Sequence, residues 1–415
     1  MNAVLNIVKN DGTPPNPGSV PPITCTVEVV TPMFLAGADN RALKQNRERV
    51  VEQEMVPNEV VAREGLRSAS VKAALRFWWR AGQPLDLDNL RRGEADLFGC
   101  VADGKSDQEG QGAMVRTRVM KNWTAKPPPE IGKNELSYLA YGCADLNQAL
   151  RPAVVPGAMS ELTVIPRHPA HIKPLSDAIE RWLLFGNLGA KSRRGWGSLS
   201  DSRWKTRVEI EAAISRHLIA GDPALPLWSS MQGADVLIKE FNATSWDSAL
   251  NEMGRVFHQF RKDLGADVID FRKQSGDPQR YAREPGKDHH RVANWLNDHG
   301  MRDFGRGDQN EILPDRVGFG LPYPMQFGRE KPLFEPAGDG VGDRRASPLI
   351  IKIHKVSSGF VGLMIILGGR FLPAQVKVQA KAGRREISLP VASRPQVLSD
   401  FSQYLTVNGF TRITP

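Results

Sequence analysis

Cysteine is scarce in this sequence of 415 residues, and its few cysteines stand far apart. They are Cys25, Cys100 and Cys143, and no Cys-x-x-Cys spacing occurs among them. A structural zinc site usually draws two ligands from such a close pair, so none is expected here. Three scattered thiols are typical of a reducing compartment, where cysteine serves as a small buried hydrophobe.

Long hydrophobic runs are also missing. The longest one, 360–367 (FVGLMIIL), is far shorter than the roughly 20 residues that a membrane-spanning helix needs. The N-terminus has neither a basic nor an apolar segment of the kind found in secretory signals. We therefore expect a soluble, cytoplasmic protein without a membrane partner.

Positive charge, by contrast, is in excess. Lysine and arginine number 55 against 46 aspartates and glutamates, which gives a net charge of +9. Such an excess favours a polyanionic partner, nucleic acid first and an acidic membrane surface second. With 40% hydrophobic residues the chain has enough apolar material for globular cores, and its length is typical of two domains.

The order of the expected elements predicts an α+β fold of two ferredoxin-like (RRM-like, βαββαβ) domains with insertions. A flexible arm rich in proline and glycine is expected over 1–22, and the first domain over 23–232. Its elements are a strand at 23–30, a helix within 64–82, strands at 112–120 and 160–166, a helix at 174–186 capped by Ser176, and a strand at 196–200.

The second domain is expected over 233–415, and a large insertion interrupts it at about 265–346. The same order of elements can recur around this insertion. Its expected elements are a strand at 235–243, a helix at 245–264, a strand pair within 347–367 and a late helix at 394–405.

A glycine-rich, basic stretch at 186–198 (GNLGAKSRRGWGS) has three possible roles: a nucleotide cradle, a solvated turn or part of an RNA surface. A Walker A loop needs a glycine directly before its lysine and lies between a strand and a helix. Here Ala190 precedes Lys191, and a helix comes before the loop, so an NTP site is not expected. Cations and glycines can still bind phosphate, and Trp196 could stack on a base.

The helix within 64–82 carries a line of cations. Lys72, Arg76 and Arg80 recur every four residues, beside an apolar stripe that would pack on a sheet. No acidic residue interrupts the line within the helix. It can follow a phosphate backbone, or it can be a solvated helix edge.

Several motifs stand together in this chain. They are VTPMFLAGAD at 30–39, SVKAALRFWWRA at 70–81, LFG at 97–99, GNLGAKSRRGWGSL at 186–199 and DRRASPLIIKIHK at 343–355. In combination they resemble the RAMP superfamily of CRISPR-associated proteins. Within it, the chain is most similar to the FWWRA-type head subunit of the type III-B (Cmr) effector complex.

This resemblance implies two ferredoxin-like domains and an RNA-binding role near the 3′ region of the guide RNA. The expected partners are guide CRISPR RNA, target RNA and other RAMP subunits of the complex. Where the family usually has a glycine after the lysine of the helix motif, this chain has Ala73. The residues expected to bind RNA, from the matched motifs together with the cation line and the loop, are Ser70, Lys72, Arg76, Arg80, Gly189, Lys191, Ser192, Arg193, Arg194 and Trp196.

No catalytic residue, metal ligand or cofactor is expected. Asp39 lies on a loop where backbone subunits of the superfamily carry an aspartate for metal-dependent cleavage, but the FWWRA subgroup does not use that position for catalysis. A cluster at 288–290 (DHH) is weak evidence for a metal site. Two alternatives stay open: a RAMP endoribonuclease acting on CRISPR or target RNA, and a scaffold that contacts only protein. Candidate histidines for an endoribonuclease are His168, His171, His258, His289, His290, His299 and His354.

Overall fold

A computed structural model describes most of the chain. The described residues are 20–35, 67–84, 86–101, 112–119, 153–221, 225–263, 312–325, 331–338 and 342–414, with short pieces between 123 and 149 and four positions between 288 and 295. The expected arm, apart from residues 20–22, lies outside them. So do Asp39, His289, His290, His299 and most of the insertion expected at 265–346.

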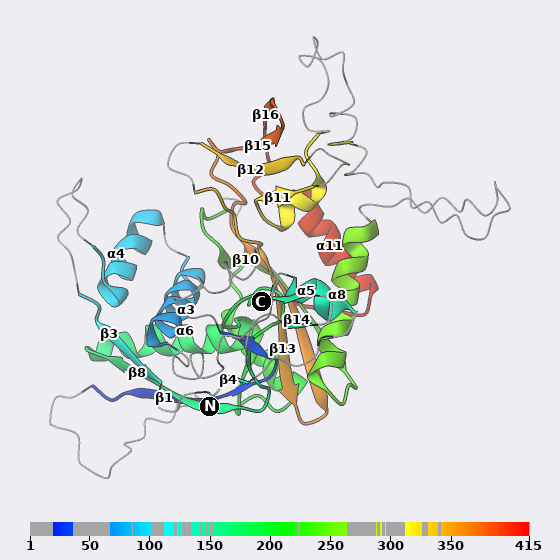
Figure 1. Cartoon of the computed structure of the whole chain (residues 1–415). Coiled ribbons are helices and arrows are strands. Elements are labelled where there is room, and N and C mark those ends of the chain that lie inside the picture. The colour runs from blue at the N-terminus through cyan, green and yellow to red at the C-terminus, as the bar shows by residue number, and fades with distance from the viewer. Residues whose placement is uncertain are drawn as a thin grey trace, which may run out of the picture.

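The first half of the chain forms the expected βαββαβ unit (Figure 1). Its four strands form an antiparallel sheet in the order β3-β8-β1-β9, which is the ferredoxin-like order. Helices α3 and α6 cover one face of it, because alternate residues of β1 point there and are buried. The elements are β1 (Ile23–Val29), α3 (Ser68–Ala81), β3 (Val115–Val119), β8 (Met159–Pro166), α6 (Ile172–Phe185) and β9 (Leu199–Asp201).

The same order recurs in the second half. The sheet order is β13-β14-β10-β17, again antiparallel, and α8 and α11 pack on one face. The α+β class and the two ferredoxin-like units are thus confirmed. The elements are β10 (Ser230–Phe241), α8 (Trp246–Asp263), β13 (Leu349–Val356), β14 (Gly359–Gly368), α11 (Gln396–Val407) and β17 (Thr411–Ile413). The predicted boundary at 232/233 falls in the first residues of β10 and stays a prediction.

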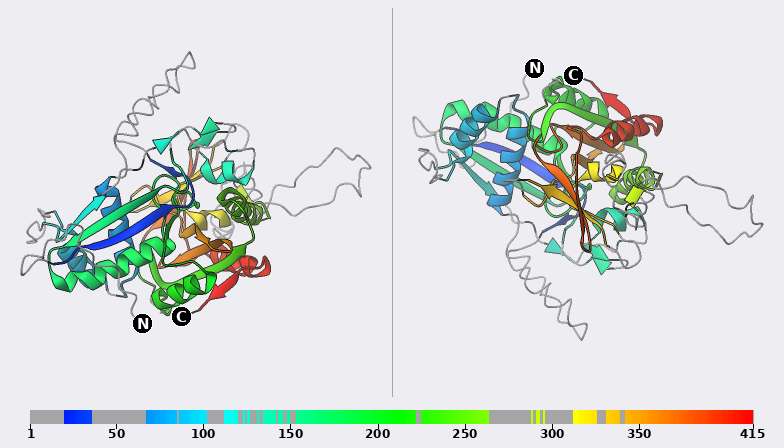
Figure 2. Two further views of the ribbon diagram at one scale, coloured as in Figure 1. Left: turned by 90° about the horizontal axis from the view of Figure 1, so that it is seen from below. Right: turned by 90° about the horizontal axis from the view of Figure 1, so that it is seen from above.

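The second sheet is buried on both faces. Leu237 and Ile351 belong to the core under α8 and α11, whereas Val236 and Ile365 join Trp78 of α3 in the core of the first unit. This explains why almost every residue of β13 and β14 is buried, without alternation. The two units lie side by side and share one core (Figure 2).

Further elements surround the two units. A third antiparallel sheet, of order β11-β12-β15-β16, has its own core around Phe334 and lies at the top of Figure 1. None of the described helices has the length and apolar character needed to cross a membrane. The remaining elements are α4 (Leu87–Phe98), α5 (Glu135–Ala140), α7 (Arg207–His217), η1 (Pro169–His171), η3 (Asp315–Phe319), β2 (Met33–Phe34), β4 (Ala125–Lys126), β5 (Ala144–Asp145), β6 (Gln148–Ala149), β7 (Ala153–Val154), β11 (Tyr323–Pro324), β12 (Leu333–Ala337), β15 (Lys377–Ala382) and β16 (Arg385–Leu389).

One predicted helix start is wrong. The helix expected to begin after Ser176 starts at Ile172, directly after η1, with His171 at its N-cap. Pro174 then lies in the first turn, where its missing N–H removes no intrahelical hydrogen bond. Pro174 thus belongs to the first turn of a helix that begins four residues before Ser176.

Candidate nucleic-acid interface

The glycines of the loop 186–198 are required by its packing on the protein. Gly189 and Gly197 have positive φ angles of 89° and 70°, which favour glycine. A Cβ atom at Gly197 would lie 1.8 Å from the carbonyl oxygen of Leu188, and one at Gly189 would lie 2.6 Å from that of Phe34. The glycine spacing is therefore explained by close backbone approach within the chain.

Backbone N–H groups of the loop point into the protein as well. Ala190 donates to the Phe34 carbonyl at 2.9 Å, Gly197 to Pro32 at 3.0 Å, and Leu188 to Gly197 at 2.9 Å. Because these three donors are already paired, they are not available to a nucleotide phosphate.

Strand β13 of the second unit holds the middle of the loop. The Asn187 side-chain amide donates to the carbonyls of Ser192 at 2.5 Å and Ile351 at 2.7 Å. Its oxygen accepts from the Ser198 hydroxyl at 2.9 Å, and the Ile351 N–H donates to the Arg193 carbonyl at 3.0 Å. The loop is therefore a junction between the two units.

A buried lysine, which the sequence did not single out, holds both ends of the loop. Lys352 is fully buried on β13, and its ammonium donates to the carbonyls of Gly186 and Leu199, each at 2.6 Å. Burial lowers the pKa of this lysine well below its ordinary value. The position of Lys352 between Ile351 and Ile353 is the sequence signal that could have identified it.

Arg193 connects the loop with α3. Its guanidinium donates to the carbonyl of Ser347 and lies over the ring of Phe77, 5.4 Å from the ring centre. Burial, and then repulsion from Arg345, lower its pKa to about 10. The two basic segments expected from the sequence, the loop and α3, thus lie next to each other.

The other polar residues of the loop differ in exposure. Gly189 is exposed, and Lys191, Ser192 and Arg194 are half-buried. Arg194 lies over the ring of Tyr138 at 5.7 Å, and burial lowers its pKa. The loop therefore keeps part of its basic surface open, with the arginines held by aromatic rings.

The expected stacking role of Trp196 is wrong. Its side chain is 0% exposed and packs against Phe34 at 5.0 Å and Trp246 at 5.9 Å between ring centres. A base could reach this ring only if the core opened. Trp196 anchors the loop and presents no face to RNA in this structure.

The cation line on α3 is present but partly neutralised. Arg76 and Arg80 both pair with Glu94 of α4, Arg80 through bonds of 2.8 and 2.9 Å. Their side chains stay 44% and 37% exposed. Ser70 and Lys72 are half-buried, and burial followed by repulsion from Arg76 lowers the pKa of Lys72. The line within the helix lacks an acid as expected, but the neighbouring helix supplies one.

The described histidines are spread over the fold, apart from His168 and His171, whose ring centres lie 5.7 Å apart. His168 accepts a hydrogen bond from Ala170 N–H, and His171 lies 3.3 Å from Asp96. His258 contacts Glu135 at 2.5 Å, and His354 is buried under the end of α6. In the part of the chain that is described, no group of three or more His, Cys, Asp or Glu side chains could hold a metal ion.

His354 is expected to make the protein sensitive to acid. Burial, and then repulsion from Lys352, lower the pKa of His354 to about 3 from an ordinary value of 6.5. The unfolded chain therefore binds a proton below pH 6.5 that the folded chain refuses, so stability falls as the pH falls toward 3. One such proton costs about 1.4 kcal/mol per pH unit.

The measurement is urea unfolding between pH 7 and pH 4, for wild type and for His354→Gln. Glutamine can keep a hydrogen bond to the Leu184 carbonyl, which His354 now contacts at 2.8 Å. We expect the wild type to lose more stability than the variant over this range. Parallel losses in the two proteins would contradict the assignment.

Comparison with known proteins identifies a family for part of the chain. The family model of the RAMP superfamily matches residues 26–200. Among solved structures, the apo form of Cmr1 from Pyrococcus furiosus is 16% identical, over 94% of this chain and 98% of that chain, with a TM-score of 0.49.

A type III-B Cmr-beta complex bound to cognate target RNA contains a chain that is 10% identical, over 92% of this chain and 99% of that chain, with a TM-score of 0.40. Comparison with curated proteins finds no similar sequence. The matched family region contains α3, α4 and the glycine-rich loop. Over residues 26–200 the chain is therefore similar to the RAMP superfamily.

Proposed function

We propose that this chain is a non-catalytic RNA-binding subunit of a cytoplasmic type III-B CRISPR effector complex. It sits at the head of the complex near the 3′ region of the guide RNA, contacts other RAMP subunits and helps to capture target RNA. The observation that carries the proposal is the contact of Arg193 with Phe77, because the basic loop thereby lies beside α3, which carries the cation line. Both segments lie in the RAMP region.

The RNA-contacting residues of the proposal follow from their exposure. The side chains of Arg76 and Arg80 stay partly exposed beside Glu94, and their guanidinium groups can bind phosphate. Lys72, Lys191 and Ser192 are half-buried, and Ser70 and Gly189 belong to the same two segments. Trp196 is not part of the surface, since it is buried in the core.

The test replaces two cations of the line by neutral residues. Lys72→Gln with Arg76→Gln should weaken binding of a labelled single-stranded RNA. If both contact phosphates, the slope of log K against log salt should become shallower by roughly 1.4. Glutamine is preferred to glutamate, because a new carboxylate beside the buried Glu94 would destabilise the helix pair.

The matched control is Arg91→Gln with Arg92→Gln on the neighbouring α4, where both side chains are exposed. It removes the same charge and should leave affinity and slope nearly unchanged. Equal effects of the two double variants would contradict a specific surface. RNA bound and left intact agrees with the proposal, cleavage of the RNA favours the endoribonuclease, and absence of binding favours the protein-only scaffold.

A further inference from the structure

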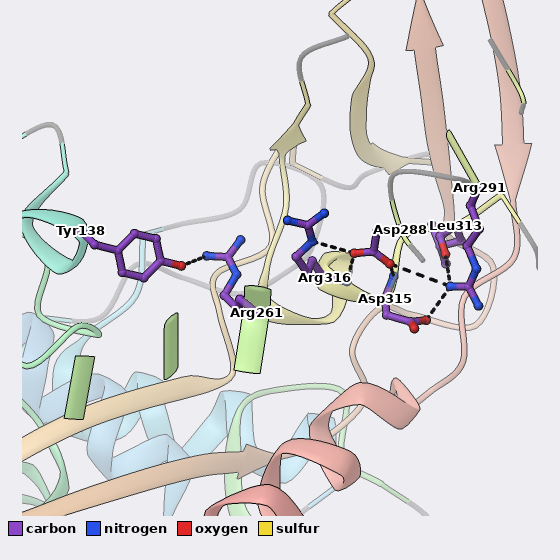
Figure 3. Close-up of polar contacts among 7 residues, drawn as sticks. All are labelled: Tyr138, Arg261, Asp288, Arg291, Leu313, Asp315 and Arg316. Atoms are coloured by element: carbon purple, nitrogen blue, oxygen red, sulfur yellow. Dashed lines mark hydrogen bonds and ion pairs between the residues drawn. The ribbon is translucent and has the colours of Figure 1, made fainter. Parts of the chain in front are cut away.

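Two arginines from distant parts of the chain share one tyrosine. Arg194 of the loop and Arg261 of α8 both lie over the ring of Tyr138 in α5, at 5.7 and 5.9 Å from its centre. Arg261 also donates to the Tyr138 hydroxyl oxygen at 2.5 Å (Figure 3). A phenol therefore stands where a carboxylate would pair with the two arginines.

The nearby carboxylates are already paired with other groups. Glu135 contacts His258 at 2.5 Å, and Asp288 accepts from Arg316 at 2.7 Å. Figure 3 shows Arg316 and Asp288 beyond Arg261, on the side away from Tyr138. Among the described residues, neither Arg194 nor Arg261 has an ion pair with a carboxylate.

The two guanidinium groups are partly withdrawn from water and close enough to repel each other. Burial lowers the pKa of Arg194, and repulsion from Arg261 contributes to that shift. The Nε atom of Arg261 is buried and has no hydrogen-bond partner. Two partly buried cations without a carboxylate among the described residues are unfavourable, and an anion bound by both would reduce that cost.

The groups of this cluster suit a phosphate. Two guanidinium groups lie at Tyr138, and Arg261 is hydrogen-bonded to its hydroxyl oxygen. Such an arrangement suits a tetrahedral oxyanion, because arginine binds phosphate oxygens in pairs.

We propose that Arg194 and Arg261, with the hydroxyl of Tyr138, bind one phosphate group at the junction of the glycine-rich loop and the second unit. The site goes beyond the proposed RNA surface, because Arg261 lies outside the RAMP region and was not expected to bind RNA. The phosphate can belong to an RNA backbone or to a free nucleotide. A carboxylate of a partner protein is the competing occupant, and the test separates it.

The experiment titrates the full chain with a fluorescent single-stranded RNA and, separately, with AMP and adenosine. Arg261→Gln and Arg194→Gln should each lower the affinity for the phosphate-bearing probe about tenfold. This is the effect expected from the loss of one charge-assisted hydrogen bond. For RNA, the salt slope should become shallower by about 0.7. If the source is a free nucleotide, AMP should bind and adenosine should not.

The matched control is Arg255→Gln, which removes a cation from an exposed position of the same helix. Arg261→Lys keeps the charge but loses the two parallel N–H donors, so this variant should bind the probe with intermediate affinity. It also provides a folded variant for the test if Arg261→Gln impairs folding. If all probes bind the Arg194 and Arg261 variants as they bind the control, the proposal is overturned. That result would favour a partner's carboxylate as the occupant of the pair.

The two proposals can fail separately. AMP binding that depends on Arg261, in a chain that does not bind RNA, supports the phosphate site and contradicts the RNA-binding function. RNA binding that depends on Lys72 and Arg76 but not on Arg194 or Arg261, with no AMP binding, supports the RNA-binding function and contradicts the phosphate site.

Discussion

Replacing Lys352 with methionine is expected to lower the free energy of unfolding by about 2–5 kcal/mol. The carbonyls of Gly186 and Leu199 would each lose a donor at 2.6 Å, in a place that water cannot reach. Burying an ammonium group has its own cost, so an apolar replacement can stabilise a protein. Here the unpaired carbonyls outweigh that gain, because one of them ends α6, where the helix dipole favours a cation.

The matched control lies three residues further along β13. Lys355 is exposed and pairs with Glu28 at 2.7 Å, so Lys355→Met should cost at most about 1 kcal/mol. Urea unfolding of both variants at pH 7 makes the comparison. Equal losses in Lys352→Met and Lys355→Met would show that the buried ammonium does not hold the loop.

The pH dependence gives this first prediction a second readout. Burial lowers the folded-state pKa of Lys352 below its ordinary value of 10.5. Between the two values the unfolded chain binds the proton and the folded chain does not, so stability rises with pH. The neutral amine still has two N–H groups for the two carbonyls. The difference in the free energy of unfolding between wild type and Lys352→Met should therefore increase as the pH rises toward 10.5.

Replacing Trp196 with alanine is expected to lower the free energy of unfolding by about 3–5 kcal/mol. The indole fills a fully buried space between Phe34 and Trp246, and the loop could close only part of the cavity. RNA affinity of the folded variant should stay close to that of wild type, since the ring has no exposed face. Trp196→Phe should lose less stability, because an aromatic ring would still fill most of the space.

Chemical unfolding and RNA titration of the same samples separate stability from binding. The titration is made at a temperature where the folded fraction of Trp196→Ala is complete. A variant that keeps its stability but loses about 1–3 kcal/mol of RNA affinity would restore the stacking role. That outcome would require Trp196 to leave the core when RNA binds.

Local patterns predicted the two βαββαβ units well. The alternation of ITCTVEV places every second residue of β1 in the core, and the apolar stripe with Trp78 directs one face of α3 inward. These periods follow from backbone geometry within a few residues, so a sequence carries them openly. The third sheet, with strands between 323 and 389, was not predicted, because its strands are short and β13 and β14 of another sheet lie between β12 and β15 in the sequence.

The sequence by itself thus determined the order of the elements, the excess of positive charge and the place of both basic segments along the chain. Only the tertiary structure decided which of their side chains face a ligand. Glu94 reaches Arg76 and Arg80 from the next helix, and Trp196 is covered by rings from β2 and α8. The physical reason is that charge pairing and burial depend on neighbours in space, and the chain brings those neighbours together from positions that no local period connects.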